Sequence, residues 1–377
     1  MVECIRRWKN VHNITVYGNE GARQLCDHFE LDGIEHVTWP ADRWKKFGRG
    51  IWWLAQTVIG CREAKKIKFS PVEKHLIIAS NEFQPNGMPA FALKKNHPGT
   101  PLVMETFLLA PKWFSGKAGP GLVFTAYRPV QKILLRKVLH EAEMILVTGE
   151  EDREFMIGEG RAPESVFAVL GGVDLSIPRS VPDPAKKTYD AVFIGRLHPQ
   201  KGPLELMTIW KTLMEKKPDA RLAVIGSGPL EVQCKARADK LGIADNVRFF
   251  GFCDGEEKYK IIKASRIVLH PAVYDSGGMA AAEALCCGLP GVSFDLPSLQ
   301  TYYPRGWLKA SPGDLAGFAG CIHRMLTDEK LYAGTSKEAL AAGLEWDWNA
   351  RAKAIWEAVE KGIIRAKSNN PFEPRRK

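Results

Sequence analysis

The chain has 377 residues, a length that predicts two domains because a single hydrophobic core rarely grows that large. Its composition, with 45% hydrophobic and 25% charged residues and a net charge of +10, is that of a soluble globular protein. The longest apolar run, residues 51–60, is too short to span a bilayer, and residues 1–10 contain no signal-peptide core. The eight cysteines form no C-x-x-C pair, which argues against a disulfide framework or a zinc site, and we expect a cytoplasmic protein.

Apolar, β-branched runs alternate with helical patterns along the chain, which predicts parallel sheets wrapped by helices. In the first half, the expected strands are residues 14–17, 36–39, 75–80, 102–107, 144–148 and 166–170. In the second half, they are residues 191–195, 221–226, 247–250, 267–270 and 291–294. Helices are expected at residues 315–327 and 329–342. The pattern therefore predicts two doubly wound α/β domains.

The expected domain organisation follows from composition. We expect an N-terminal domain over residues 1–177, a linker rich in proline and charge over 178–188, a C-terminal domain over 189–345, a helix over 346–366 and a polar tail over 367–377. The last helix is amphipathic, and its apolar residues recur at helical spacing: Trp348, Ala352, Ile355, Trp356 and Val359.

The start of the first domain departs from the usual pattern. Residues 2–9 are typical of the end of an amphipathic helix that should itself follow a strand, so the usual first strand and its loop have no counterpart. Either this sequence begins downstream of the true start, or the domain is abbreviated.

Residues 274–292 (YDSGGMAAAEALCCGLPGV) are the most informative stretch. Asp275 stands eight residues before Glu283, and a Ser-Gly-Gly turn between them opens a helix whose free N–H groups could receive a phosphate or sugar oxygen. Helical side chains lean toward the N-terminus, so Glu283 should point back to the same pocket. An N-cap followed by a surface acid is the structural alternative.

Two cations follow the first strand of the second domain, in residues 193–202 (FIGRLHPQKG). Arg196 and Lys201 should lie at the carboxyl edge of a parallel sheet, where such folds bind ligands. A planar guanidinium and a compact ammonium suit a diphosphate, although a solvated basic loop is the alternative.

Glycines follow the next two strands. Gly226 and Gly228 would let a ligand approach the backbone closely, but a tight strand-to-helix turn explains them equally well. Gly251 and Phe252 close another strand, where backbone amides could contact a base edge.

Taken in order, these motifs resemble glycosyltransferase family 4, the retaining sugar-nucleotide transferases of the GT-B fold. The motifs are GR-x4-KG at 195–202, G-x-G-P at 226–229, the F-x-G-F turn, and the acid-x7-acid pair ending in EAL-x2-GLP at 283–290. Residues 83–103 (FQPNGMPAFALKKNHPGTPLV) are also similar to family members, so the resemblance covers most of the chain. It implies two Rossmann-like doubly wound domains, an interdomain cleft and a C-terminal helix that returns toward the first domain.

The resemblance also implies a reaction, the transfer of a hexose-type sugar from a nucleotide-sugar donor to a glycan or lipid-linked acceptor, with retention. Arg196 and Lys201 would hold the diphosphate, Glu283 the ribose and Asp275 the sugar hydroxyls. The donor-binding residues it implies are Gly195, Arg196, Lys201, Gly226, Ser227, Phe252, Cys253, Asp275, Ser276, Gly277, Gly278, Met279, Ala280 and Glu283. Arg196, Lys201, Asp275 and Glu283 would carry catalysis, with no metal and no cofactor.

This chain differs from the family pattern at two positions. It has Asp275 where the family usually has Glu, and Phe107 where many members have His. A nucleotide-sugar epimerase on the same fold and a non-catalytic sugar-nucleotide-binding protein are the alternative functions.

Two basic segments carry the positive charge. Residues 42–75 hold nine Lys or Arg against three acids, and residues 112–140 hold six against none. The first mixes indoles with cations, at Trp44, Lys45, Lys46, Arg49, Trp52 and Trp53. The second sets Lys132, Arg136 and Lys137 beside the apolar Val130, Ile133, Leu134 and Val138.

These segments predict that the basic N-terminal half attaches to an anionic membrane surface that presents a lipid-linked acceptor. Ordinary helices with core faces and solvated cationic faces explain them equally well. No nucleic-acid partner is expected, because no known binding motif for one is present.

Overall fold

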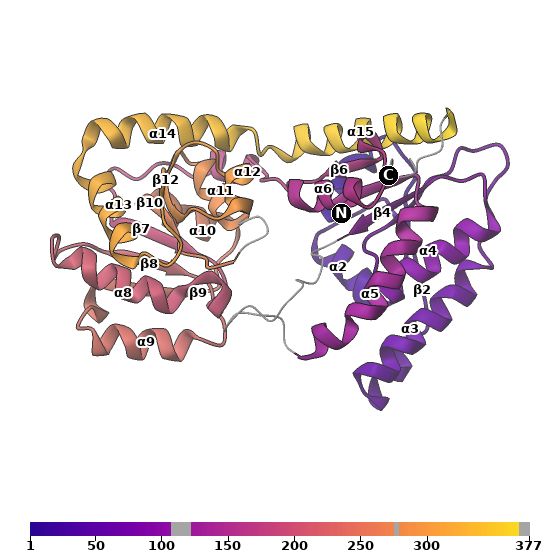
Figure 1. Ribbon diagram of the computed structural model, residues 1–377, viewed down its shortest axis with the longest axis horizontal. Coiled ribbons are helices and arrows are strands. Elements are labelled where there is room, and N and C mark those ends of the chain that lie inside the picture. Colours follow the sequence, from indigo (N-terminus) through magenta and orange to yellow (C-terminus); the bar gives the residue numbers. More distant parts are fainter. Residues whose placement is uncertain (107–121, 275–278, 369–377) are drawn as a thin grey trace. The chain divides into compact units, whose positions relative to one another are not determined.

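The structure is a computed structural model that describes residues 1–106, 122–274 and 279–368. The described residues form two compact units (Figure 1). Unit 1 comprises residues 1–106, 122–169 and 352–368, and unit 2 comprises the described residues between 170 and 351.

Residues 178–188, expected to be a linker, belong to unit 2. Val181 is buried there, and its carbonyl oxygen accepts a hydrogen bond from Lys263 Nζ at 2.6 Å. Packing of this segment against the unit therefore places the boundary at residue 169, ahead of the expected position at 177.

The sheet of unit 2 has six parallel strands in the order β12-β11-β10-β7-β8-β9. The strands are β7 (Tyr189–Ile194), β8 (Leu222–Ile225), β9 (Val247–Gly251), β10 (Ser265–His270), β11 (Gly291–Phe294) and β12 (Trp307–Ala310). In register, Ala191 of β7 lies between Leu222 of β8 and Ile267 of β10. Counted from the first strand of the unit, the order is 3-2-1-4-5-6, which is the doubly wound arrangement. The winding reverses between β7 and β10.

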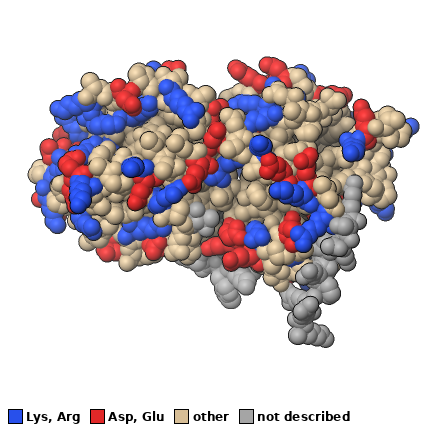
Figure 2. Space-filling view, turned by 90° about the horizontal axis from the view of Figure 1, so that it is seen from above, with Lys and Arg blue, Asp and Glu red and all other residues tan. Residues whose placement is uncertain are grey.

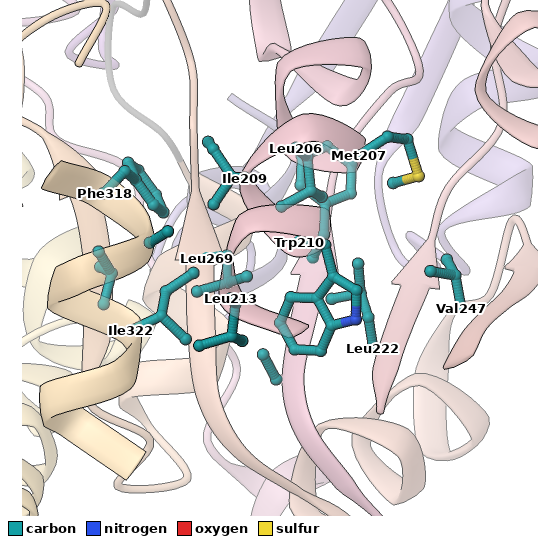
Figure 3. Close-up of a cluster of buried hydrophobic side chains, with 14 of the residues drawn as sticks. Leu206, Met207, Ile209, Trp210, Leu213, Leu222, Val247, Leu269, Phe318 and Ile322 are labelled. Atoms are coloured by element: carbon teal, nitrogen blue, oxygen red, sulfur yellow. The ribbon is translucent and has the colours of Figure 1, made fainter. Parts of the chain in front are cut away.

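Helices cover both faces of this sheet. They are α7 (Ser176–Ser180), η4 (Pro199–Lys201), α8 (Pro203–Met214), α9 (Glu231–Lys240), η5 (Ala244–Asn246), α10 (Gly255–Lys263), α11 (Met279–Leu285), α12 (Pro297–Tyr302), α13 (Leu315–Thr327) and α14 (Glu329–Leu344). Side chains alternate along β7, so that Phe193 belongs to the buried cluster on one face and Val192, with Ile262 of α10, to the cluster on the other face. Figure 3 shows the first cluster, which includes Trp210 of α8 and Phe318 of α13. Burial on both faces explains why the strands are continuous apolar runs.

Unit 1 contains two parallel sheets. β1 (Thr15–Gly18) pairs with β2 (Glu35–Thr38), while β3 (Ile77–Ala79), β4 (Leu102–Thr106), β5 (Met144–Val147) and β6 (Val166–Ala168) form a four-stranded sheet in that order.

The helices of unit 1 surround these sheets. They are α1 (Val2–Trp8), α2 (Glu20–His28), η1 (Asp42–Phe47), α3 (Arg49–Ala64), α4 (Gln84–Asn96), α5 (Leu122–Glu141), α6 (Glu150–Gly158), η3 (Pro163–Ser165) and most of α15 (Trp348–Ser368). Trp8 Nε1 donates a hydrogen bond to the Ala352 carbonyl at 3.0 Å, and the Trp8 ring packs edge-on against Trp356. α15 thus returns the chain to unit 1, as the resemblance implied.

All eleven expected strands are confirmed, with ends that shift by at most two residues within the described chain. β12 was not expected. In the basic segment 112–140, the core explanation is right for Leu134 and Val138, which are both buried. Across the part of the chain that the structure describes, every helix is too short or too polar to cross a membrane.

Candidate active site

Backbone hydrogen bonds join the loops that follow β7, β8, β9 and β10. Leu197 N donates to Ser227 O at 2.9 Å and so joins the loops after β7 and β8. Val273 N, after β10, donates to Gln200 O at 3.1 Å. The predicted motifs of unit 2 therefore meet at the carboxyl edge of the sheet, beside the point where the winding reverses and where doubly wound sheets bind ligands.

Gly226 is required by this loop packing. Its φ is +132°, and a Cβ at this position would lie 1.9 Å from the Gly195 carbonyl oxygen. Its N–H donates to Gly251 O at 2.6 Å, which fixes the end of β9. The sequence pattern indicated that Gly226 lets a ligand approach the backbone or forms part of a tight turn. In the structure, the atom that leaves no room for a side chain is the Gly195 carbonyl oxygen of the loop after β7.

The two cations of residues 193–202, Arg196 and Lys201, lie on the loop that follows β7. Arg196 is exposed, and Lys201 is partly exposed at the end of η4. Gly202 follows with φ +64°, and a Cβ there would lie 2.0 Å from the Pro271 carbonyl oxygen. The backbone that carries both charges is thus fixed by close contacts with the loops that follow β8 and β10.

Glu283 lies on α11 and contacts a lysine that the sequence analysis did not identify. Lys258 of α10 donates to Glu283 Oε1 at 2.9 Å and to Asp254 Oδ1 at 2.8 Å. Asp254 directly follows Phe252 and Cys253, so the acid assigned to the ribose lies beside the loop assigned to the base. The i,i+4 spacing of Asp254 and Lys258 predicts a helical ion pair, but the sequence carries no signal for the bond to Glu283.

The pKa values of this ion pair are shifted. Burial raises the pKa of the Glu283 carboxyl above its ordinary value, and the Lys258 ammonium opposes that rise. Burial alone would lower the pKa of Lys258, but Glu283 and Asp254 together raise it. Lys258 therefore favours the ionised form of Glu283, which is the form that accepts hydrogen bonds from hydroxyl groups.

The structure separates the predicted base contacts. Phe252 is exposed after β9, whereas the Cys253 side chain is buried in the core of unit 2, so Cys253 could meet a base only through its backbone. Met279 and Ala280 begin α11, and the Met279 thioether packs so closely on Gly171 that a Cβ there would lie 2.6 Å from the sulfur. Asp275, Ser276, Gly277 and Gly278, like Phe107, lie outside the described residues.

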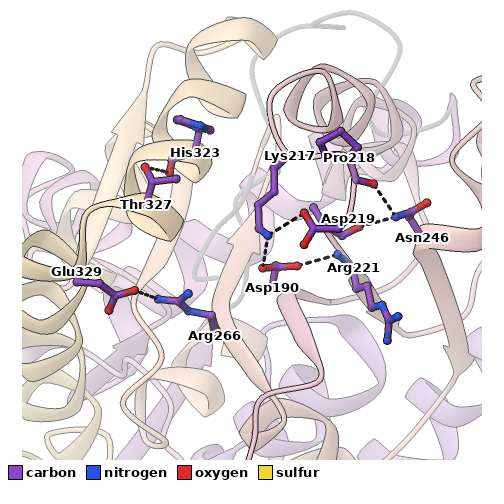
Figure 4. A network of polar contacts seen from close by, with 11 residues as sticks. Asp190, Lys217, Pro218, Asp219, Arg221, Asn246, Arg266, His323, Thr327 and Glu329 are labelled. Carbon is purple, nitrogen blue, oxygen red and sulfur yellow. Dashed lines mark hydrogen bonds and ion pairs between the residues drawn. The ribbon is translucent and has the colours of Figure 1, made fainter.

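The opposite, amino edge of the same sheet carries charges that pair with one another (Figure 4). Asp190 Oδ2 accepts a hydrogen bond from Arg221 N at 2.9 Å, and Lys217 Nζ lies 3.6 Å from Asp190 and 3.0 Å from Asp219. Asn246 Nδ2 donates to the Ala220 carbonyl at 2.9 Å. These contacts tie the starts of β7, β8 and β9 together, which is a structural role.

Two Rossmann-like units, with exposed cations at the carboxyl edge of the second, define a protein of the GT-B fold. Residues 178–341 match the family described as glycosyl transferases group 1. A D-inositol 3-phosphate glycosyltransferase of Corynebacterium urealyticum is 29% identical over 228 residues, 58% of this chain and 51% of that relative. The chain thus spans about half the length of this relative.

Solved structures share the fold over nearly the whole chain. HepE of Anabaena, in complex with UDP, aligns over 95% of this chain and 96% of its own with a TM-score of 0.71 and 18% identity, and it has also been solved with UDP and glucose. Sucrose-phosphate synthase of Thermosynechococcus elongatus covers 89% of this chain and 84% of its own, with a TM-score of 0.66 and 16% identity.

Proposed function

We propose that this protein is a retaining glycosyltransferase of family 4 that moves a hexose-type sugar from a nucleoside diphosphate donor to a glycan or lipid-linked acceptor. The observation that carries the proposal is the meeting of two chemistries at the carboxyl edge of the unit 2 sheet. The joined loop after β7 would offer Arg196 and Lys201 to a diphosphate, and Lys258, which donates a hydrogen bond to Glu283, favours the ionised form of that carboxyl beside the loop after β9. A nucleoside diphosphate needs cations for its phosphates and an acceptor of hydrogen bonds for its ribose.

The similarity to HepE supports the choice of a uridine diphosphate donor. In the proposed complex, Glu283 accepts hydrogen bonds from the ribose hydroxyls, and the base lies against the backbone of residues 251–253. Asp275 takes the sugar hydroxyls, the role that the family resemblance implies for it.

The charge that develops during transfer explains the catalytic role of the cations. Breaking the anomeric bond places positive charge on the sugar and negative charge on the departing diphosphate, so prepositioned cations stabilise the transition state more than the ground state. In the proposed retaining reaction, the oxygen of the acceptor hydroxyl bonds to the anomeric carbon as the bond from that carbon to the diphosphate breaks. An oxygen of the leaving phosphate accepts the proton of the hydroxyl. The protein then supplies no nucleophile and needs no divalent metal.

The experiment measures binding and turnover separately. UDP-, GDP- and ADP-hexoses are titrated by calorimetry, and transfer to a panel of glycan and lipid acceptors is followed by mass spectrometry with and without EDTA. We expect tight binding of one nucleotide and EDTA-insensitive transfer that keeps the anomeric configuration.

Lys201→Ala and Glu283→Ala test the assigned residues. Each should lower kcat/KM by about 30- to 1000-fold, which corresponds to about 2–4 kcal/mol of barrier, while the thermal unfolding midpoint stays near that of the wild type. Wild-type turnover in both variants would refute the assignment. Consumption of donor without acceptor would indicate an epimerase, and donor binding without turnover would indicate a binding protein.

A further inference from the structure

Several large apolar side chains on η1 and α3 of unit 1 are exposed. The position of α3 in unit 1 is labelled in Figure 1. We define this apolar face by five residues and their exposed fractions: Trp44 36%, Phe47 53%, Ile51 49%, Leu54 63% and Val58 51%. Single exposed apolar residues are common, but a contiguous group of this kind marks an interaction surface.

Packing within unit 1 does not account for this face. Ile51, Leu54 and Val58 follow the spacing i, i+3, i+7 and therefore share one side of α3. Gly60 lies two and a half turns from Ile51, on the opposite side, where a Cβ would approach Trp39 and Pro89 to 2.6 and 2.7 Å. The helix thus packs on α4 through small residues and directs its larger aliphatic side chains to solvent.

Exposed cations accompany the apolar residues on η1 and at the start of α3. Arg43, Lys45, Lys46 and Arg49 are all exposed, and the sequence contains no acid between residues 43 and 62. The preceding acid, Asp42, accepts a hydrogen bond from Trp52 Nε1 at 3.0 Å and lies 3.3 Å from Lys45. On the face of the molecule in Figure 2, by contrast, basic and acidic side chains are interspersed.

We propose that the apolar face docks on an anionic lipid bilayer. Its aliphatic and aromatic side chains would enter the boundary between headgroups and acyl chains while the four cations contact lipid phosphates. Apolar burial alone would suit a protein partner, and cations alone would suit any polyanion. The combination of both, without acids, fits an anionic membrane best. If the face docks in this way, the acceptor would be lipid-linked and presented at the membrane surface. This last step rests on the proposed glycosyltransferase function.

Vesicle flotation tests the docking without any sugar nucleotide. The wild-type protein should float with phosphatidylcholine vesicles that contain about 30% phosphatidylglycerol, and much less with phosphatidylcholine alone or at high salt. The variant Ile51→Ser/Leu54→Ser/Val58→Ser should lower the partition coefficient at least tenfold. A second variant, Lys45→Gln/Lys46→Gln/Arg49→Gln, changes only exposed charges and should have a similar effect at low salt.

A matched control removes exposed apolar side chains from unit 2. Val232→Ser/Leu340→Ser/Leu344→Ser should leave flotation unchanged, and circular dichroism checks that all variants are folded. Failure of the wild type to bind anionic vesicles, or undiminished binding by both η1–α3 variants, would overturn the proposal. The proposal would also be overturned if the wild-type protein were a dimer that does not bind vesicles and the serine variant were a monomer, because the face would then bind a second copy of the chain. Calorimetry with UDP in the absence of lipid tests the donor site separately, since none of these variants alters it.

Discussion

At the amino edge of the unit 2 sheet, the Lys217 ammonium pairs with the carboxylates of Asp190 and Asp219, whereas at the carboxyl edge Arg196 is exposed. The backbone differs as well. Gly226 and Gly202 approach neighbouring carbonyl oxygens so closely that no side chain fits, and this packing holds the carboxyl-edge loops together. The comparison indicates that paired charges join the strands at one edge, while packed backbone at the other edge fixes the loop that carries Arg196 and Lys201.

The largest effect should come from Gly226→Ala. The new Cβ would meet the Gly195 carbonyl oxygen at 1.9 Å and impose strain at φ +132°, so we expect a loss of about 2–5 kcal/mol in unfolding free energy and weakened donor binding. Gly242→Ala is the matched control, because Gly242 also has a positive φ, +66°, but has open space around its Cβ position. It should cost only about 1–2 kcal/mol. Denaturant unfolding measures both, and equal losses would show that loop packing does not explain Gly226.

Strands such as β5 and β8 could be predicted from the sequence because every residue in them is buried, and strands buried on both faces are continuous apolar runs. β12 escaped prediction because Leu308 and Lys309, in the middle of this short edge strand, are only partly buried. The linker was placed by its prolines and charges, but burial of Val181 joins it to unit 2. Composition reports local preference, and tertiary contacts decided these two cases.

The candidate site was predictable to the same extent. The spacing of Arg196 and Lys201 after an expected strand placed them at the carboxyl edge, because parallel strands all end there. Lys258 could not be found in this way, because its bond to Glu283 joins two helices whose packing is not encoded in either segment. The sequence also could not show why residue 226 must be glycine, because the atom that would clash with a side chain, the Gly195 carbonyl oxygen, belongs to another loop.

Lys258→Met should change the pH dependence of donor binding. In the proposed complex the ribose hydroxyls donate to ionised Glu283, whose pKa is raised by burial, so affinity should fall as the pH drops through that raised pKa. Removal of the ammonium raises this pKa further and moves the loss of affinity to higher pH. Affinity should recover toward the wild-type value in alkaline buffer, where Glu283 ionises even without its partner.

The matched control is Lys260→Met, two residues away on α10, where an exposed lysine pairs with Glu256 at 3.4 Å. Its pH profile should equal that of the wild type. Calorimetric titration with UDP over a range of pH distinguishes a positioning role from a folding defect. A uniform loss of affinity at every pH in Lys258→Met would mean that Lys258 only supports the structure.

The smallest effect should come from the amino edge, with Asp190→Asn. The amide keeps an oxygen that can accept a hydrogen bond from Arg221 N but loses the charge that attracts Lys217, so we expect a loss of about 1 kcal/mol in unfolding free energy and an unchanged rate of sugar transfer. In Asp219→Asn the altered side chain is exposed, so although Lys217 lowers the pKa of Asp219, solvent screening should leave stability and transfer at wild-type values. Paired denaturant unfolding and transfer assays on both variants measure this. A loss of transfer in Asp190→Asn without a loss of stability would contradict the structural role given to the amino edge. A charge at that edge would then affect catalysis at the other end of the strands.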